Sequence, residues 1–253
     1  MKLITRFLYA LYRPVFFLLV LLDTTILGVL TIIASYFDPT GRRVHYIGKF
    51  WARLNLLLSG VRVRLINPQA IKPGQPYIVM SNHQSHYDVW ALIGHMPLQL
   101  RWVMKIELRK IPIFGLGCER MGHIFIDRGH PDRAYKSLEA AGQKIRDGAS
   151  VVFFPEGTRS PDGNLLPFKK GGFNIALTAG VPILPITVRG SRGVLPKGTV
   201  RVRPGTIELL IHQPVTLEGY STENREALME RVKSTIAAGL SAETGPAGSR
   251  GDL

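Results

Sequence analysis

The chain has 253 residues, enough for one folded domain with an appendage. Lys and Arg outnumber Asp and Glu by 32 to 18, so the formal net charge is +14 with histidine neutral. This excess favours anionic surroundings such as nucleic acid, anionic lipid, phosphorylated ligands or an acidic carrier protein, and does not choose among them. The single cysteine, Cys118, excludes an internal disulfide and is typical of a reducing compartment; we expect a buried structural thiol.

The first feature in chain order is an apolar run from Val15 to Phe37, interrupted by Asp23 and a few hydroxyl groups. A membrane-spanning helix needs about 20 such residues, and the run is too long for the apolar part of a signal peptide. Basic residues flank it on both sides, so they give no orientation. We expect a helical hairpin within one leaflet, with Asp23-Thr24-Thr25 near its bend. The alternatives are a single span, with a costly intramembrane carboxyl group, and a buried core helix.

Residues 44–59 form a second segment with apolar side chains at helical spacing, among them Ile47, Phe50 and Trp51, while Lys49 and Arg53 lie off that stripe. This pattern predicts an amphipathic helix. The sequence leaves open whether the helix lies in a membrane interface or docks on the folded domain.

From residue 61 short apolar segments alternate with longer helical ones. We predict strands at 61–65, 77–80, 102–104, 124–126, 151–154, 183–188, 200–203 and 207–212, and helices at 88–96, 131–147, 170–179 and 223–240. The alternation predicts an α/β fold with a mixed, largely parallel sheet flanked by helices. The turn signal at 204–206 predicts that the last two strands pair as an antiparallel hairpin.

These patterns divide the chain into three parts. Residues 1–60 are predicted to be membrane-anchoring helices, and residues 61–240 the main domain. The Gly-, Ser- and Ala-rich end, 241–253, is expected to be a disordered tail.

A histidine and a carboxylate follow the predicted 77–80 strand. His83 comes directly after it, and Asp88 falls near the start of the next helix. The carboxyl ends of strands are where α/β folds bind ligands, and the intervening turn is long enough to fold Asp88 onto the imidazole. Such a carboxylate fixes the tautomer of the ring and leaves the other nitrogen free as a base. The chain has no GxSxG nucleophile, so the pair suggests direct activation of a substrate hydroxyl.

Two other interpretations of this segment stay open. A histidine and an aspartate at this spacing occur often by chance. Alternatively, His83, His86 and Asp88 are metal ligands, although only His123 offers a further ligand of this kind. The segment alone is weak support for an enzyme.

Two later segments add positive charge. GHIFIDR at 122–128 and FPEGTRS at 154–160 each include the end of a predicted strand and then deliver an arginine, Arg128 or Arg159. Guanidinium groups match phosphate oxygens, and Gly157 allows the backbone to come close to a ligand. The alternative for either arginine alone is a surface salt bridge.

Four segments in order resemble the motifs of the glycerolipid acyltransferases: N-H-x4-D at 82–88, G-x-I-F-I-D-R at 122–128, F-P-E-G-T-R-S at 154–160 and V-P-I-L-P-I at 181–186. Size and the apolar N-terminal segment are most similar to the bacterial 1-acylglycerol-3-phosphate acyltransferases of that family. The resemblance covers about residues 75–190. Each motif alone is moderately specific, and the ordered set is a strong signal.

The resemblance implies a role for each matching residue. His83 would deprotonate the free sn-2 hydroxyl of a lysophosphatidate, which attacks an acyl thioester to form phosphatidic acid in phospholipid biosynthesis, and Asp88 would orient His83. The positions that match the glycerol-phosphate site are Arg128, Glu156, Gly157 and Arg159, with Lys105 as an additional cation. The positions that match the acyl-donor motif are Val181, Pro182 and Pro185; the prolines are equally consistent with a core strand.

The resemblance also implies the setting. No metal or organic cofactor is expected, and the donor is acyl-CoA or acyl-acyl carrier protein. The enzyme would work on the cytoplasmic face of the bacterial inner membrane, against an anionic lipid surface. The alternatives are another lysolipid acceptor, such as a lyso-ornithine lipid, and a non-catalytic membrane-tethered protein that binds anionic ligands. Nucleic-acid binding is suggested by charge alone, since no recognition motif is present.

Overall fold

The computed structural model describes residues 2–127 and 129–241. The helices are α1 (Lys2–Ser35), α2 (Val44–Leu58), α3 (Tyr87–His95), α4 (Phe114–Arg120), α5 (Pro131–Arg146), α6 (Gly171–Ala179), α7 (Ser191–Val194) and α8 (Arg225–Ser241). The strands are β1 (Val61–Ile66), β2 (Ile78–Ser81), β3 (Leu100–Lys105), β4 (Ile124–Ile126), β5 (Ser150–Phe153), β6 (Ile183–Arg189) and β7 (Gly205–Ile211). Two short 3-10 helices are η1 (Pro68–Ala70) and η2 (Ile106–Lys110).

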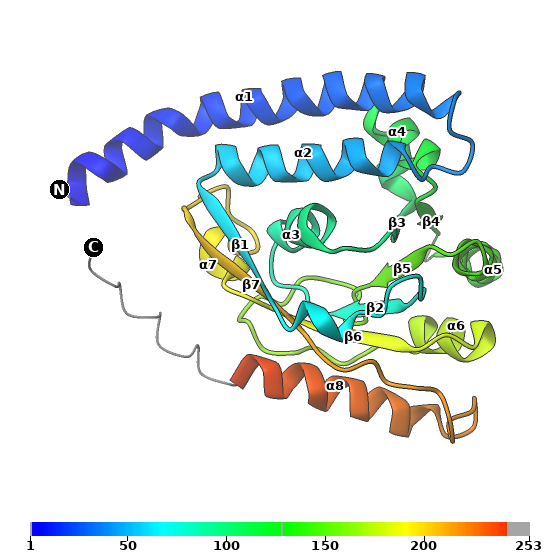
Figure 1. The fold of residues 1–253 in the computed structure, drawn as a ribbon. Helices are drawn as coiled ribbons and strands as arrows, with labels where there is room; N and C mark the ends of the chain where they lie inside the picture. Colours follow the sequence, from blue (N-terminus) through cyan, green and yellow to red (C-terminus); the bar gives the residue numbers. More distant parts are fainter. Residues whose placement is uncertain (1, 128, 242–253) are drawn as a thin grey trace.

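The strands form one sheet in the order β1-β7-β6-β2-β5-β3-β4 (Figure 1). Neighbouring strands are parallel, except that β6 and β7 are antiparallel. The carboxyl ends of the parallel strands β2, β3 and β5 therefore meet at one edge of the sheet. The predicted α/β fold with a mixed, largely parallel sheet is confirmed.

The predicted terminal hairpin is wrong. Residues 200–203 form no strand, and β7 pairs with β6 on one side and β1 on the other. The backbone N–H of Arg203 donates to the carbonyl oxygen of Val194 at 2.9 Å, which closes residues 194–203 into a loop. The alternation of valine and arginine at 200–203 therefore reflects a basic loop. Of the predicted turn at 204–206, Gly205 and Thr206 already belong to β7 and pair with β1.

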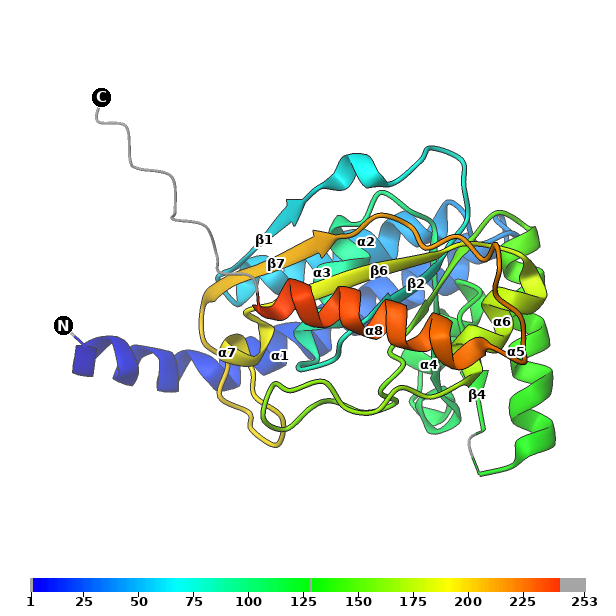
Figure 2. The ribbon, with the colours of Figure 1, turned by 90° about the horizontal axis from the view of Figure 1, so that it is seen from below.

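Helices cover both faces of the sheet. In Figure 1, α2 and α3 lie above it with α1 over them, and α6 and α8 lie below. The upper core includes Leu56, Leu92 and Trp102, and the lower core includes Ile145 and Phe173. Figure 2 shows α8 running along β6 on the lower face.

The N-terminal segment differs from the expected hairpin. Helix α1 runs without a break through Asp23-Thr24-Thr25, and the chain turns later, at residues 36–43, before α2 returns beside α1 (Figure 1). Polar side chains of α2 contact the Asp23-Thr24-Thr25 segment. Trp51 Nε1 donates to Thr24 Oγ1 at 2.9 Å, and Asn55 Nδ2 lies 3.5 Å from Asp23 Oδ1. These contacts give Thr24 and one carboxylate oxygen of Asp23 a partner while the helix stays continuous.

The outer face of this helix pair is apolar. Within α1, Leu11–Ser35 is long and apolar enough to cross a membrane, with a mean hydropathy of 2.5. Its large apolar side chains are mostly exposed, and α2 adds others. Monomeric soluble proteins rarely expose so continuous an apolar surface. The exposed apolar residues include Leu18, Leu21, Leu22, Ile26 and Ile33 of α1 and Phe50 and Leu57 of α2.

The basic residues of α2 face the domain. Lys49 Nζ donates to the carbonyl oxygen of Met96 at 2.9 Å, and Arg53 Nε donates to that of Gly94 at 2.7 Å. Both carbonyls lie at the end of α3, where the helix dipole favours positive charge. Helix α2 is therefore docked on the domain through its cations, while apolar residues such as Phe50 point outward.

The lower face contains a close contact between α8 and the sheet. Gly239 of α8 is buried, and a Cβ atom there would overlap Thr187 Oγ1 and lie 2.9 Å from His212 Nε2. Thr187 also donates to the carbonyl oxygen of Ile236 at 3.0 Å. A larger side chain at position 239 would push α8 away from β6.

We predict that Gly239→Ala lowers the unfolding temperature, because overpacking a core costs about 1–3 kcal/mol. At about 2–4 °C per kcal/mol for a chain of this size, the loss is on the order of 2–12 °C in a thermal unfolding scan. Gly171→Ala is the matched control, since a Cβ atom there meets nothing within 4 Å. Equal unfolding temperatures for the two variants would contradict the described packing of α8.

Candidate active site

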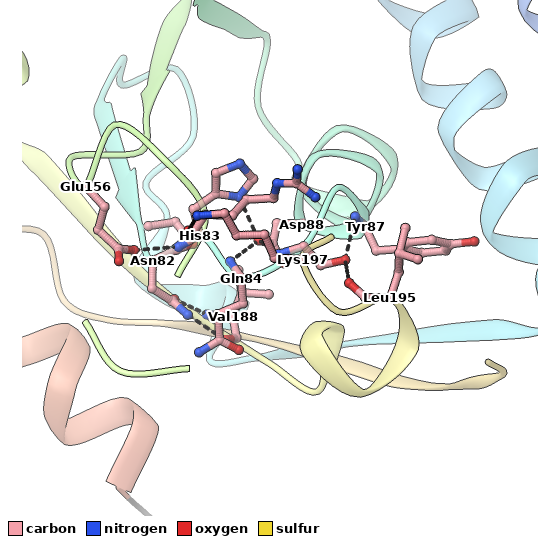
Figure 3. A network of polar contacts seen from close by, with 12 residues as sticks. Asn82, His83, Gln84, Tyr87, Asp88, Glu156, Val188, Leu195 and Lys197 are labelled. Atoms are coloured by element: carbon pink, nitrogen blue, oxygen red, sulfur yellow. Dashed lines mark hydrogen bonds and ion pairs between the residues drawn. The ribbon is translucent and has the colours of Figure 1, made fainter. Parts of the chain in front are cut away.

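His83 and Asp88 meet in the turn between β2 and α3. His83 Nδ1 and Asp88 Oδ2 are 2.8 Å apart, as the spacing predicts (Figure 3). The same oxygen accepts the backbone N–H groups of Gln84, at 2.7 Å, and Ser85, at 2.9 Å. Asp88 is fully buried, and these three hydrogen bonds stabilise its negative charge. With Nδ1 committed to the carboxylate, Nε2 is the ring nitrogen left for a substrate.

The turn is fixed to the sheet by two buried side chains. The Asn82 amide makes a pair of hydrogen bonds to the backbone of Val188 in β6, donating at 2.9 Å and accepting at 2.7 Å. Glu156 Oε1 accepts the backbone N–H of His83 at 2.7 Å, and the carbonyl oxygen of His83 accepts the N–H of Ser160 at 2.7 Å. The backbone of His83 is thus held from both sides.

Glu156 contacts the backbone of His83. Its side chain is buried, and its second oxygen, Oε2, accepts the backbone N–H of Leu166 at 2.9 Å. Burial raises the pKa of Glu156, although the hydrogen bonds from Leu166 and His83 oppose that shift. Because both carboxylate oxygens bind backbone N–H groups, the structure gives Glu156 contacts that hold the turn around His83.

The imidazole of His83 stacks on Phe154. The two rings are nearly parallel, with centroids 3.8 Å apart, and Trp102 packs against Phe154 from β3. His86 lies nearby with an exposed side chain, and its pKa is lowered by partial desolvation and by the charge of Arg159. The orientation of the His83 ring is thus fixed in two ways, by stacking on Phe154 and by the hydrogen bond to Asp88.

Other predicted residues surround the same opening. Gly157, Arg159 and Lys105 line a cavity together with His83. Gly157 has a φ of +71°, and a Cβ atom there would come within 2.9 Å of Lys169 Cε, so this position favours glycine. Arg128 lies outside the described residues.

The cavity has a volume of about 580 Å³, within the usual range for substrate pockets. It runs from His83 and Arg159 to the space beneath the N-terminal helices, where most of its wall is apolar. Residues from four helices contribute to the wall, including Leu27 of α1, Trp51 of α2, Trp90 of α3 and Phe114 of α4.

Two histidines also line this cavity without adding charge. Burial lowers the pKa of His45 to about 4 and that of His123 to about 3, so both rings are neutral near pH 7. His123 Nδ1 accepts the backbone N–H of Trp102 at 3.3 Å, deeper in the sheet than Lys105. The cationic groups of the cavity are thus gathered at its opening.

The segment expected to contact the acyl donor is elsewhere. Val181 and Pro182 precede β6 at the opposite edge of the sheet from His83, and Pro185 lies within β6 beside Met80. None of the three lines the cavity. Their position fits the alternative that the prolines shape a core strand.

Sequence patterns did not indicate Phe154 or Lys197 as neighbours of His83. Lys197 Nζ donates to the carbonyl oxygen of Arg159 at 2.7 Å, which brings the chain beyond β6 into the site (Figure 3). The only signal for Phe154 was its place as the first residue of the FPEGTRS segment. Within the described part of the chain, no three His, Cys, Asp or Glu side chains gather as a metal site requires.

The arrangement combines an oriented base, a cationic opening and an apolar chamber. A base of this kind can take a proton from a hydroxyl group, the arginine can bind an anionic group, and the chamber can hold a hydrocarbon chain. These are the parts needed for acyl transfer to an amphiphilic alcohol.

Comparisons with known proteins agree with this arrangement. Residues 62–189 match the Acyltransferase family. A chloroplast 1-acyl-sn-glycerol-3-phosphate acyltransferase of Arabidopsis thaliana is 33% identical over 80% of this chain and 59% of its own length. The enzyme of that name from Pseudomonas aeruginosa is 30% identical over 90% of both chains. The crystal structure of the 1-acyl-sn-glycerophosphate acyltransferase PlsC from Thermotoga maritima superposes with a TM-score of 0.79, at 29% identity over 94% of this chain and 96% of that one.

The extent of the match varies among the relatives. The chain spans between half and two thirds of the plant and human relatives, for example 64% of a human 1-acyl-sn-glycerol-3-phosphate acyltransferase alpha that is 35% identical. The bacterial relative and the solved structure match over nearly their full length. Both the family match and these identities lead to one conclusion: this chain belongs to the acyltransferase family.

Proposed function

We propose that the protein transfers an acyl group from a thioester to the free sn-2 hydroxyl of 1-acylglycerol-3-phosphate, forming phosphatidic acid. The observation that carries the proposal is the His83–Asp88 pair, whose histidine lines a largely apolar cavity together with Arg159. The names of the relatives support the same reaction.

The proposed reaction uses the geometry of the pair. His83 Nε2 takes the proton of the acceptor hydroxyl, and the oxygen attacks the carbonyl carbon of the thioester. The C–S bond then breaks, and the departing sulfur takes the proton from the imidazolium. Asp88, held at 2.8 Å from Nδ1, stabilises the imidazolium while it exists. No group of the enzyme forms a covalent bond with the acyl chain.

Arg159 and Lys105 are proposed to bind the phosphate of the acceptor, with Arg128 as the matching position of the second motif. Arg159 and Lys105 lie at the end of the cavity that contains His83. A guanidinium fork binds two phosphate oxygens at once, which would hold the glycerol at a fixed distance from the base. Gly157 lines the same cavity, and the lack of a side chain would let the acceptor come close to the backbone.

Glu156 is proposed to act through His83. Its two oxygens bind the N–H groups of His83 and Leu166 and so join the base to the loop that follows β5. The residue would thereby position the base relative to Arg159.

The protein is proposed to work on the cytoplasmic face of a bacterial inner membrane. The exposed apolar side chains of α1 and α2 would enter the lipid, and the cavity beneath them would receive the acyl chain without exposing it to water. The donor would be acyl-CoA or acyl-acyl carrier protein, which reach this face from the cytoplasm.

We predict that His83→Ala lowers kcat by about 100- to 10,000-fold, because the general base is lost. Asp88→Asn should lower kcat by up to about 10,000-fold, because an amide no longer holds His83 in the tautomer that leaves Nε2 free as a base. The measurement is acyl transfer to lysophosphatidate by purified protein in detergent. His86→Ala is the matched control, since His86 lines the same cavity and is not assigned a catalytic role. Near-normal turnover by His83→Ala would exclude the mechanism.

Glu156→Gln is predicted to lower kcat by about 10- to 100-fold with little change in the KM for lysophosphatidate, because a shifted base reacts more slowly. In the variant, the NH2 group of the amide would face the backbone N–H of His83 or Leu166, and that N–H would lose its acceptor. Glu230→Gln, at an exposed position of α8, is the control. A rise in KM with unchanged kcat would instead mean that Glu156 contacts the substrate.

Arg159→Ala is predicted to raise the KM for lysophosphatidate by about tenfold or more, since a charged hydrogen-bonding partner is lost. The same variant should have little effect on an acceptor without phosphate, such as a monoacylglycerol or a lyso-ornithine lipid. A panel of acceptors measured with both proteins tests this. Preference of the wild-type protein for an acceptor without phosphate would overturn the proposed substrate.

A further inference from the structure

A basic loop borders the proposed active site and lies beyond the segment that matches the family, which ends at residue 189. We call residues 192–203 the basic loop. It has four cationic side chains and no acidic residue, and all four are exposed. None of them forms an ion pair with an acidic side chain of the described residues. The four are Arg192, Lys197, Arg201 and Arg203.

The basic loop has a defined shape. It begins within the short helix α7, and its last residue returns to that helix where the N–H of Arg203 donates to the carbonyl oxygen of Val194. Inside it, the N–H of Thr199 donates to the carbonyl oxygen of Pro196 at 3.3 Å, and Gly198 has a φ of +79°. A positive φ at the third residue is the mark of a type II turn, which presents Lys197 at its second position. The cations are thus held on an ordered support.

Hydrogen bonds connect this support to the catalytic turn. Ser85 Oγ donates to the carbonyl oxygen of Leu195 at 2.8 Å, and Lys197 Nζ donates to that of Arg159 (Figure 3). Arg192 Nη2 lies 3.4 Å from the carbonyl oxygen of Pro161 in the loop that follows β5. A partner bound to the basic loop would therefore be held beside the opening that leads to His83.

We propose that the basic loop is the docking surface for an acidic carrier protein that delivers the acyl thioester. This rests on the proposed acyl transfer, because a thioester donor must reach His83. Unpaired cations around an active site attract a polyanionic partner and speed its encounter. The four cations are spread along the whole loop, whereas a site for one small phosphate would gather them around a point.

The composition of the loop favours a protein partner over lipid. The exposed large apolar residues lie mainly on α1 and α2, and within the basic loop Val200 is the exposed large apolar residue. One apolar contact surrounded by charges resembles the rim of a protein interface more than a surface that enters a membrane. The acceptor lipid and the acyl donor would then approach on different surfaces.

The test compares two donors with the same acyl chain. Full-length protein in neutral detergent is assayed with palmitoyl-CoA and with palmitoyl-acyl carrier protein, at fixed lysophosphatidate. We expect Arg201→Glu combined with Arg203→Glu to lower kcat/KM for the carrier donor by about tenfold or more relative to the CoA donor. Binding of fluorescently labelled carrier protein, followed by anisotropy, should weaken in parallel and in a salt-dependent way.

The matched control is Arg231→Glu combined with Lys233→Glu on α8, which makes the same change in net charge on the lower face of the sheet. An equal effect of the two double variants would overturn the proposal, as would unchanged carrier binding. Loss of binding only to vesicles of anionic phospholipid would also overturn it and would assign the loop to the membrane. Failure of the wild-type protein with both donors would instead defeat the proposed reaction, while the anisotropy measurement would still test docking.

Discussion

The buried carboxylate of Asp88 is the interaction on which the proposed chemistry depends. One of its oxygens accepts the imidazole of His83 and two backbone N–H groups, so the turn and the base are ordered by the same charge. A buried carboxylate without such partners would be strongly unfavourable. The Asn82 amide and Glu156 then fix this turn to β6 and to the loop after β5. The base is thus supported by the sheet rather than by a flexible loop.

The charged and the apolar side chains of α2 lie on opposite sides of the helix. The cations of α2 face inward to the carbonyl groups at the end of α3, while its apolar residues face outward with those of α1. The cavity beneath these helices continues the apolar environment to His83. Arg159 and Lys105 lie at its opening, and the basic loop lies next to Arg159. The proposed amphiphilic acceptor and the proposed acidic donor would therefore approach the site over different surfaces.

Several structural features could not be predicted from the sequence, because they depend on contacts between residues that are far apart in the chain. Glu156 stood in a motif beside Arg159, and only the fold reveals that both of its oxygens bind backbone N–H groups 73 and 10 residues away. Asp23-Thr24-Thr25 suggested a bend, because the partners that Trp51 and Asn55 supply are invisible in the α1 sequence. Helices α4 and α7 were missed, since each is too short for a helical period to stand out.

The sequence by itself determined the α/β alternation, the positions of most strands and helices, and the pairing of His83 with Asp88. These follow from local periodicity and from a turn of fixed length, which require no knowledge of distant residues. Only the tertiary structure decided that α1 is continuous, that 200–203 is a loop, and that α1, α2, α3 and α4 enclose the cavity with the sheet. Only the tertiary structure also revealed the contacts of His83. Its ring stacks on Phe154, and its backbone is hydrogen-bonded to Glu156 and Ser160. Such contacts arise from packing between elements, and packing depends on the whole chain.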